Sequence, residues 1–259
     1  MNLRPSGYEP DGHSRLPHLA EIKFIFLFKS VSSYLNILSK SKNMICGIDE
    51  AGRGPIIGPM VIAGSAANEK VIEKLKELGV KDSKLLSKKR REELFIEIKE
   101  ITNYEIIVLS ANKIDEYNFS GTNLNQMEAK YISKIIEKLN PELSIIDSPE
   151  PNPKKFEKMI QDKLSKKYNL LAEHKADSNH TIAAAASILA KVTRDNTIEE
   201  IKSKVGENIG SGYPSDPNTK KFLEKNFRGP INKYLRKCWK TYKNLDKPAQ
   251  SNLGDFGKS

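Results

Sequence analysis

Four acidic residues of this chain stand at or just beyond the ends of apolar runs. Asp49 and Glu50 follow the first run, Asp147 ends another, and Asp177 lies shortly after a third. Ligand and catalytic groups in open α/β sheets gather at such strand ends. Four carboxylates brought together would repel one another and raise their own pKa values. Divalent cations remove this repulsion, and hard oxygen ligands suit Mg²⁺ or Mn²⁺. We therefore predict a site for two such ions, an arrangement that suits phosphodiester cleavage.

For any one of these acids taken alone, a turn or a helix cap is the better explanation, because Asp is common in turns. The adjacent pair is harder to explain in this way, since Glu50 brings repulsion and no benefit to a turn. Gly52, Arg53 and Gly54 follow the pair closely. Glycine permits a close approach of the backbone, and an Arg can bind a phosphate through two hydrogen bonds. Such a tripeptide alone is often only a turn, but beside the acids it favours a contact with a nucleic-acid backbone.

Tyr213 lies between Gly212 and Pro214. A tyrosine in such a stiff loop is either surface packing or a ring that stacks on a sugar or base, and composition does not decide between them. His174 and His180 are candidates for acid–base catalysis. We expect them to be structural or solvent-facing, because a metal-bound water needs no histidine.

The net charge of the chain is +10, and residues 217–243 carry nine Lys or Arg and one acid, with aromatic residues between them. Scattered lysines can simply line a solvated helix face. A local excess of this size, interleaved with aromatics, favours a surface that faces phosphates.

The apolar pattern alternates between strand and helix spacing from Met44 onward. It predicts an α/β sheet domain with a helical C-terminal extension. Ser178 and Asn179 are candidate caps for the long helix, whose alanine run 183–186 would allow close packing on the sheet. The expected strands are 45–48, 60–66, 104–109, 143–146 and 169–173, and the expected helices are 69–78, 87–100, 123–139, 154–166 and 181–204.

Composition divides the chain into four parts: an N-terminal appendage (1–43), a catalytic domain (44–205), a basic helical region (206–246) and a tail (247–259). With only two cysteines, a disulfide framework is implausible and a reducing cytoplasm fits. The longest apolar run, 24–28, is far shorter than the ~20 residues that span a bilayer. Nothing in the sequence requires more than a monomer.

Six segments together resemble type 2 ribonuclease H, specifically archaeal ribonuclease HII. They occur in order and without an evident gap between Met44 and about Tyr242, whereas nothing in the family accounts for 1–43. The segments are 47–55, 82–84, 146–148, 174–177, 185–195 and 212–217.

The resemblance implies a ribonuclease H-like fold, with a central five-stranded mixed sheet flanked by helices and a C-terminal helical region. It implies an endoribonuclease that hydrolyses the RNA strand of RNA/DNA hybrids and incises DNA duplexes 5′ to an embedded ribonucleotide. The products would be a 3′-hydroxyl and a 5′-phosphate. The implied ligands of the two metal ions are Asp49, Glu50, Asp147 and Asp177.

The resemblance also assigns the residues that would contact the substrate. Gly52, Arg53 and Gly54 would read the 2′-hydroxyl at the RNA–DNA junction, and Tyr213 would stack there. The remaining phosphate contacts would be Lys84 and Arg194.

Gln250, Leu253 and Phe256 have the spacing of a sliding-clamp binding motif, although Gly257 replaces its second aromatic residue. A short motif can arise by chance in a floppy tail. A terminal position in a family of enzymes that repairs replicated DNA favours clamp binding.

Two other functions remain open on the residues alone. A non-catalytic nucleic-acid-binding protein would use the basic region, but it leaves the four acids unexplained. Another ribonuclease H-like nuclease, such as a resolvase, would lack the combination of 52–54 with Tyr213.

Overall fold

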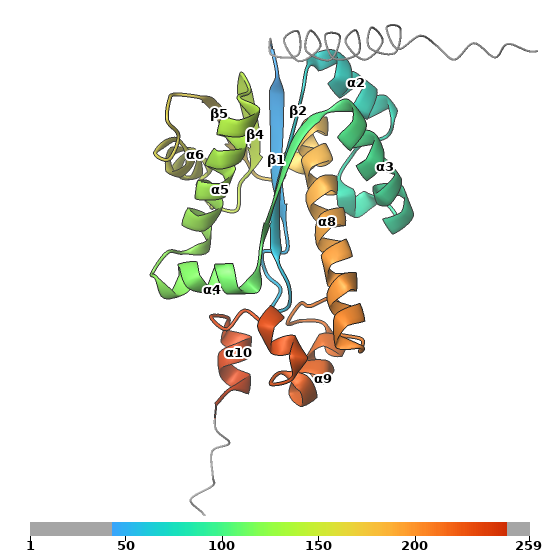
Figure 1. Ribbon diagram of the computed structural model, residues 1–259. Coiled ribbons are helices and arrows are strands. Elements are labelled where there is room, and N and C mark those ends of the chain that lie inside the picture. The colour runs from blue at the N-terminus through green and yellow to red at the C-terminus, as the bar shows by residue number, and fades with distance from the viewer. Residues whose placement is uncertain (1–42, 248–259) are drawn as a thin grey trace, which may run out of the picture. The chain divides into compact units, whose positions relative to one another are not determined.

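The computed structural model describes residues 43–247, whose centre is a five-stranded sheet of order β3-β2-β1-β4-β5 (Figure 1). β1 pairs antiparallel with β2 and parallel with β4, so the sheet is mixed, as predicted. β3 is antiparallel to β2, and β5 is parallel to β4. The strands are β1 (Ile45–Ala51), β2 (Met60–Ala67), β3 (Asn103–Leu109), β4 (Leu143–Asp147) and β5 (Asn169–Glu173).

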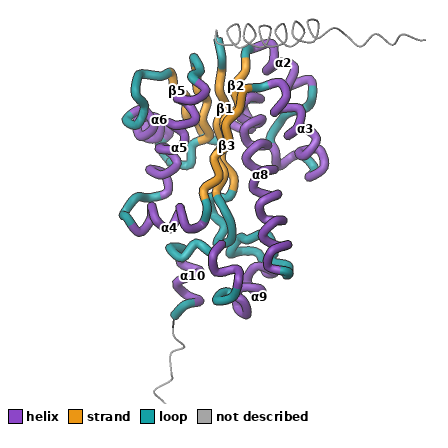
Figure 2. The backbone as a smooth tube through the Cα atoms, viewed as in Figure 1, coloured by secondary structure: helices purple, strands orange, loops and turns teal. Residues whose placement is uncertain are grey.

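Helices cover both faces of the sheet (Figure 2). One layer holds α4 (Ala111–Phe119), α5 (Leu124–Leu139) and α6 (Pro153–Gln161), and the opposite layer holds α2 (Glu69–Glu77), α3 (Lys88–Ile101) and α8 (Thr181–Val205). The remaining helices are η1 (Ser83–Leu85), α7 (Ala176–Asn179), α9 (Pro217–Asn226), η2 (Pro230–Tyr234) and α10 (Lys240–Leu245).

The apolar pattern of the central strands follows from this double cover. Cys46 and Ile48 of β1 pack in the cluster under α5, whereas Val61 and Ala63 of β2 pack under α8. A strand that is buried on both faces needs apolar residues at successive positions, so it reads as a run and not as an alternation.

The alanine run of α8 lets this helix lie very close to β1. A Cβ atom added at Gly47 would come within 2.3 Å of the backbone nitrogen of Ala183. Small residues on both partners are therefore required at this contact, which confirms the close packing expected for residues 183–186. It also fixes the position of α8 beside the acidic end of β1.

Side-chain caps begin several of the helices where the sequence changes from polar to amphipathic. The Ser87 side chain accepts a hydrogen bond from the Arg90 amide at the start of α3. Asn123 and Gln126 form a reciprocal capping box at the start of α5. The expected caps of α8 are wrong, because Ser178 and Asn179 lie in the short helix α7 and His180 takes the N-cap position without a side-chain bond.

The C-terminal region packs on the loop that joins β1 to β2. Ile56 and Ile57 of this loop share a buried cluster with Phe222 and Ile231, and Ile57 forms an isolated β-bridge with Leu235. The described residues belong to one compact unit. The boundary between 205 and 206 remains a prediction. The predicted appendage 1–43 and tail 247–259 lie outside the described residues, except for Asn43 and Lys247.

Several elements differ from the pattern-based expectation. β1 continues to Ala51, because it pairs with β2 as far as Val61. α4 was missed, and α6 ends at Gln161 instead of 166. Among the helices of residues 43–247, none combines the length and hydropathy that crossing a bilayer requires.

Candidate active site

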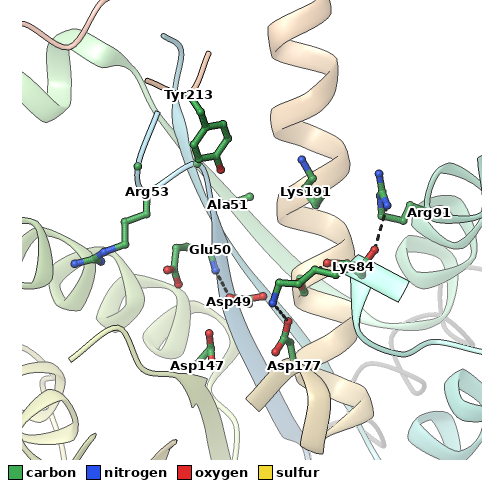
Figure 3. Close-up of a pocket in the computed structure, with 14 residues that line it drawn as sticks. Asp49, Glu50, Ala51, Arg53, Lys84, Arg91, Asp147, Asp177, Lys191 and Tyr213 are labelled. Carbon is green, nitrogen blue, oxygen red and sulfur yellow. Dashed lines mark hydrogen bonds and ion pairs between the residues drawn. The ribbon is translucent and has the colours of Figure 1, made fainter. Parts of the chain in front are cut away.

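The parallel pairing of β1 and β4 brings distant acids together. Ile48 pairs with Ile146, so Asp49 and Asp147 follow side by side at the same end of the two strands. Carboxylate oxygens of Asp49, Glu50 and Asp147 all lie within 4.8 Å of one another. Asp177, at the start of α7, lines the same cavity (Figure 3).

These carboxyl groups repel one another in a buried setting. Burial, followed by the negative charge of Asp147, raises the pKa of Asp49 to about 8. Burial and the charges of Glu128 and Asp49 raise the pKa of Glu50 well above its ordinary value. Burial also raises the pKa of Asp147, although its Oδ1 accepts a hydrogen bond of 2.9 Å from the Ala176 amide. The negative charges of these carboxylates are thus not balanced by neighbouring positive charges, as is typical of a site that binds a cation.

Lys84 reaches this cavity from η1, and its Nζ lies 3.2 Å from Oδ2 of Asp177 (Figure 3). The Asp82 side chain caps η1 by accepting from the Lys84 amide at 2.9 Å, and it also accepts from the Ser178 hydroxyl at 3.0 Å. Burial acts to lower the pKa of Lys84, but the hydrogen bond and charge of Asp177 outweigh it and raise that pKa. The Lys84 ammonium group is therefore held beside the acids. This contact joins η1 to α7, which are far apart in sequence.

The segment 52–54 leaves β1 directly beside the acids and lines the cavity. Gly52 has a φ of 84°, and a Cβ there would come within 2.6 Å of the Arg194 side chain, so this position requires glycine. Arg53 forms an ion pair with the buried Glu128 of α5 and a hydrogen bond to Asn125. Its guanidinium is therefore engaged by α5, and the expected phosphate contact of Arg53 stays a prediction.

Tyr213 lies with its ring next to this segment, and both line the cavity. Its ring is 3.6 Å from the position that a Cβ of Gly54 would occupy, and the Arg194 guanidinium lies 5.2 Å from the ring centroid. Arg194 is only 2% exposed and donates to the Ser211 carbonyl at 3.1 Å. The structure thus places Arg194 behind Tyr213, and this burial argues against the expected direct phosphate contact.

Asp216 holds the Tyr213 loop in place. Its carboxylate accepts from the Ser211 amide at 2.6 Å and from the Asn218 amide at 2.9 Å, where it caps α9. These bonds, with the Ser211 bond the largest cause, lower the pKa of Asp216 to about 2.

Other residues of the cavity wall were not predicted: Ser83, Arg91, Ser187 and Lys191. Ser187 and Lys191 are four residues apart on α8, so helical spacing from Arg194 could have indicated that they share a face. One feature of the sequence could have indicated that Glu128 has a charged partner such as Arg53: it is an acidic residue on an otherwise apolar helix face. His174 and His180 do not line the cavity. The His174 ring lies 3.1 Å from the Ser148 carbonyl, and His180 lies 3.1 Å from Glu173.

A mixed five-stranded sheet with acids at the shared end of β1 and β4 defines the class of ribonuclease H-like nucleases. The family model for ribonuclease HII matches residues 46–242. A ribonuclease HII of Methanococcus maripaludis is 50% identical over 230 residues, covering 86% of this chain and 95% of the relative. The chain belongs to the ribonuclease HII family, whose members are metal-dependent endoribonucleases.

Two solved structures show the same fold. Ribonuclease H2 of Pyrococcus horikoshii is 40% identical with a TM-score of 0.71, covering 78% of this chain and 96% of that one. Ribonuclease HII of Archaeoglobus fulgidus, solved as a complex with PCNA, is 38% identical with a TM-score of 0.70, covering 80% and 98%. The predicted ribonuclease H-like fold and ribonuclease H activity are therefore confirmed.

The capping role of Asp216 predicts a pH-dependent loss in an Asp216→Ala variant. Removing an N-cap costs about 1 kcal/mol of unfolding free energy at neutral pH. Because the folded pKa is about 2, below the ordinary 3.8, this contribution is present above pH 4 and is lost as the pH falls toward 2. Urea unfolding from pH 7 to pH 3 measures the difference between variant and wild type. Ser215→Ala on the same loop is the control, and a difference that does not shrink below pH 4 would contradict the assignment.

Proposed function

We propose that this cavity cleaves the RNA strand of RNA/DNA hybrids and incises duplex DNA 5′ to an embedded ribonucleotide, leaving a 3′-hydroxyl and a 5′-phosphate. One observation carries the proposal: buried, mutually repelling carboxylates share a cavity with residues 52–54 and Tyr213. The family membership supports the ribonuclease activity. A purely binding protein would gain nothing from acids that repel phosphate.

The proposed metal ligands are Asp49, Glu50, Asp147 and Asp177. Three of them present oxygen atoms within 4.8 Å of one another, and hard oxygen donors suit Mg²⁺ or Mn²⁺. Two such ions, when bound, would supply a nucleophilic water and stabilise the leaving oxygen. The chain itself orients these ligands, because the Ala176 amide holds Asp147 and the Glu50 amide donates to Asp49 at 2.7 Å.

The proposed reader of the ribonucleotide is the segment 52–54 together with Tyr213. Gly54 places no side chain on the wall of this cavity, and the Tyr213 ring offers a face on which a sugar or base can stack. Lys84, beside Asp177, is placed to contact a phosphate next to the metal ligands. Arg194 supports this arrangement from behind the ring.

Replacing Asp49 by Asn should abolish cleavage and leave substrate binding largely in place. Loss of one of the proposed ligands would remove several kcal/mol of metal assistance, which corresponds to a decrease in kcat of at least about 1000-fold. Cleavage of a duplex with one ribonucleotide in Mg²⁺ measures kcat, and a gel-shift titration measures affinity. Asp162→Asn on the exposed end of α6 is the control. Retained activity of the Asp49 variant would refute the ligand assignment.

Replacing Gly54 by Ala tests the reading role without a steric penalty inside the protein. The added methyl group meets no atom closer than 3.6 Å, so the unfolding free energy should hardly change. The methyl group would instead add bulk at the cavity wall, against the Tyr213 ring, where the proposed ribonucleotide would bind. We expect kcat/KM for a single embedded ribonucleotide to decrease at least about 10-fold, the equivalent of about 1.4 kcal/mol. Unchanged kcat/KM would remove residues 52–54 from the proposed reader.

We further propose that Gln250, Leu253 and Phe256 bind a sliding clamp, although these residues lie outside the described residues. The support is the tail motif and the PCNA complex of the Archaeoglobus fulgidus relative. A chain that ends before Gln250 should lose binding to the clamp in a pull-down and keep its cleavage of short duplexes. The double variant Leu253→Ala, Phe256→Ala should lose clamp binding in the same way as the truncated chain. The control variant Ser251→Ala should bind the clamp as the wild type does. Clamp binding that survives the truncation would refute this proposal.

A further inference from the structure

The three carbonyl oxygens of residues 52–54 are all bound by side chains from the C-terminal region. Arg236 donates from Nη2 to the Gly52 carbonyl at 2.6 Å and from Nη1 to the Arg53 carbonyl at 2.9 Å. Trp239 donates from Nε1 to the Gly54 carbonyl at 3.1 Å. No residue between 44 and 205 supplies an equivalent set of bonds to these carbonyls among the described contacts.

The Arg236 side chain is both deeply buried and fully engaged in hydrogen bonds. It is the largest fully buried side chain in the described residues, and its third donor, Nε, bonds the Gly58 carbonyl at 3.1 Å. Burial, followed by the positive charge of Arg194, lowers the pKa of Arg236 to about 9, which still leaves it charged at neutral pH. A buried charge is tolerated only when it is well hydrogen-bonded. Because its hydrogen-bond acceptors are main-chain carbonyls, the guanidinium holds those carbonyls in fixed positions.

Arg236 is itself fixed from several sides. Its amide donates to the Ile56 carbonyl at 2.9 Å, and its guanidinium lies 4.9 Å from the Trp239 ring centroid. The Asp115 carboxylate of α4 accepts from the amides of Lys237 and Cys238, at 2.8 and 2.9 Å. The turn that carries Arg236 and Trp239 is therefore anchored to α4 and to the loop after β1.

The direction of these bonds sets the direction of the amides in the segment. In a trans peptide the carbonyl and the following N–H point to opposite sides. With the Gly52 and Arg53 carbonyls turned toward Arg236, the amides of Arg53 and Gly54 point the other way. Neither amide donates a hydrogen bond to an acceptor in residues 43–247, so both remain available as donors to a ligand.

We propose that Arg236 and Trp239 are positioning residues that fix the segment 52–54 in the orientation that selects a ribonucleotide. The proposal rests on the reading role given to 52–54 above. It makes the C-terminal region part of substrate selection and not only a basic surface for phosphates. The segment 52–54 and the turn 236–239 are more than 180 residues apart, so the selection would depend on their packing together.

The test compares Arg236→Lys and Trp239→Phe with Leu235→Ala. Leu235 is also fully buried and lies next to Arg236, but its side chain belongs to the apolar cluster with Ile57. It therefore reports the effect of a destabilised C-terminal region by itself. The measured quantities are kcat and KM for a duplex with one ribonucleotide, Ki for the matching all-DNA duplex, and the midpoint of urea unfolding.

We expect Trp239→Phe, which removes one hydrogen bond, to lower kcat/KM by about 3- to 10-fold, and Arg236→Lys to lower it by more than about 10-fold. Ki for the all-DNA duplex should stay within about 2-fold of wild type in both, because phosphate contacts persist. Leu235→Ala should lose stability and keep its kcat/KM within about 2-fold, at a temperature where every variant is folded.

Two results would overturn the proposal. One is an unchanged kcat/KM in both Arg236→Lys and Trp239→Phe, and the other is an equal loss in Leu235→Ala. If Gly54→Ala lowers kcat/KM and the Arg236 and Trp239 variants do not, only the positioning role fails. If Gly54→Ala has no effect, the reading role of 52–54 fails instead.

Discussion

The mutual repulsion of carboxyl groups at the shared end of β1 and β4 is the constraint on which the site depends. Asp49 is a buried and Glu50 a half-buried strand residue, and parallel pairing places Asp147 beside them. Apolar packing on both faces of the sheet holds this arrangement and leaves the acids no freedom to separate. Their raised pKa values express that cost, and a bound cation would relieve it. The ion pair between Lys84 and Asp177 shows that a positive charge is stabilised at this acidic cluster.

A second set of constraints surrounds the acids and concerns the direction of the backbone. Gly52 turns the chain out of β1 with a φ that other residues rarely adopt. The turn that carries Arg236 and Trp239 then holds the carbonyls of 52–54 from behind. Tyr213 faces the segment from the other side, supported by Arg194. In the proposed function, cleavage of the RNA strand and selection of the ribonucleotide are thus assigned to different parts of one cavity. Both depend on contacts between segments that are distant in sequence.

The sequence predicted the central features because they are local. Apolar runs followed by acids indicated strand ends, and the family resemblance supplied the ordered motifs and the mixed sheet. Contacts across the chain were not predictable in this way. Nothing in the basic run 217–243 indicates that Arg236 is buried while its neighbour Lys237 is exposed, because that depends on the carbonyls that happen to face it. Arg194 was expected to contact a phosphate, because helical spacing alone does not show that it is buried beside Tyr213.

The most direct test of the metal site is anomalous diffraction from crystals soaked in Mn²⁺. We predict two anomalous peaks in the cavity, each within coordination distance of about 2.0–2.3 Å from oxygens of Asp49, Glu50, Asp147 or Asp177. Lys84 should then have moved away from Asp177. A cavity that stays without an anomalous peak at saturating Mn²⁺, or peaks that lie only at other acids of the surface, would contradict the account.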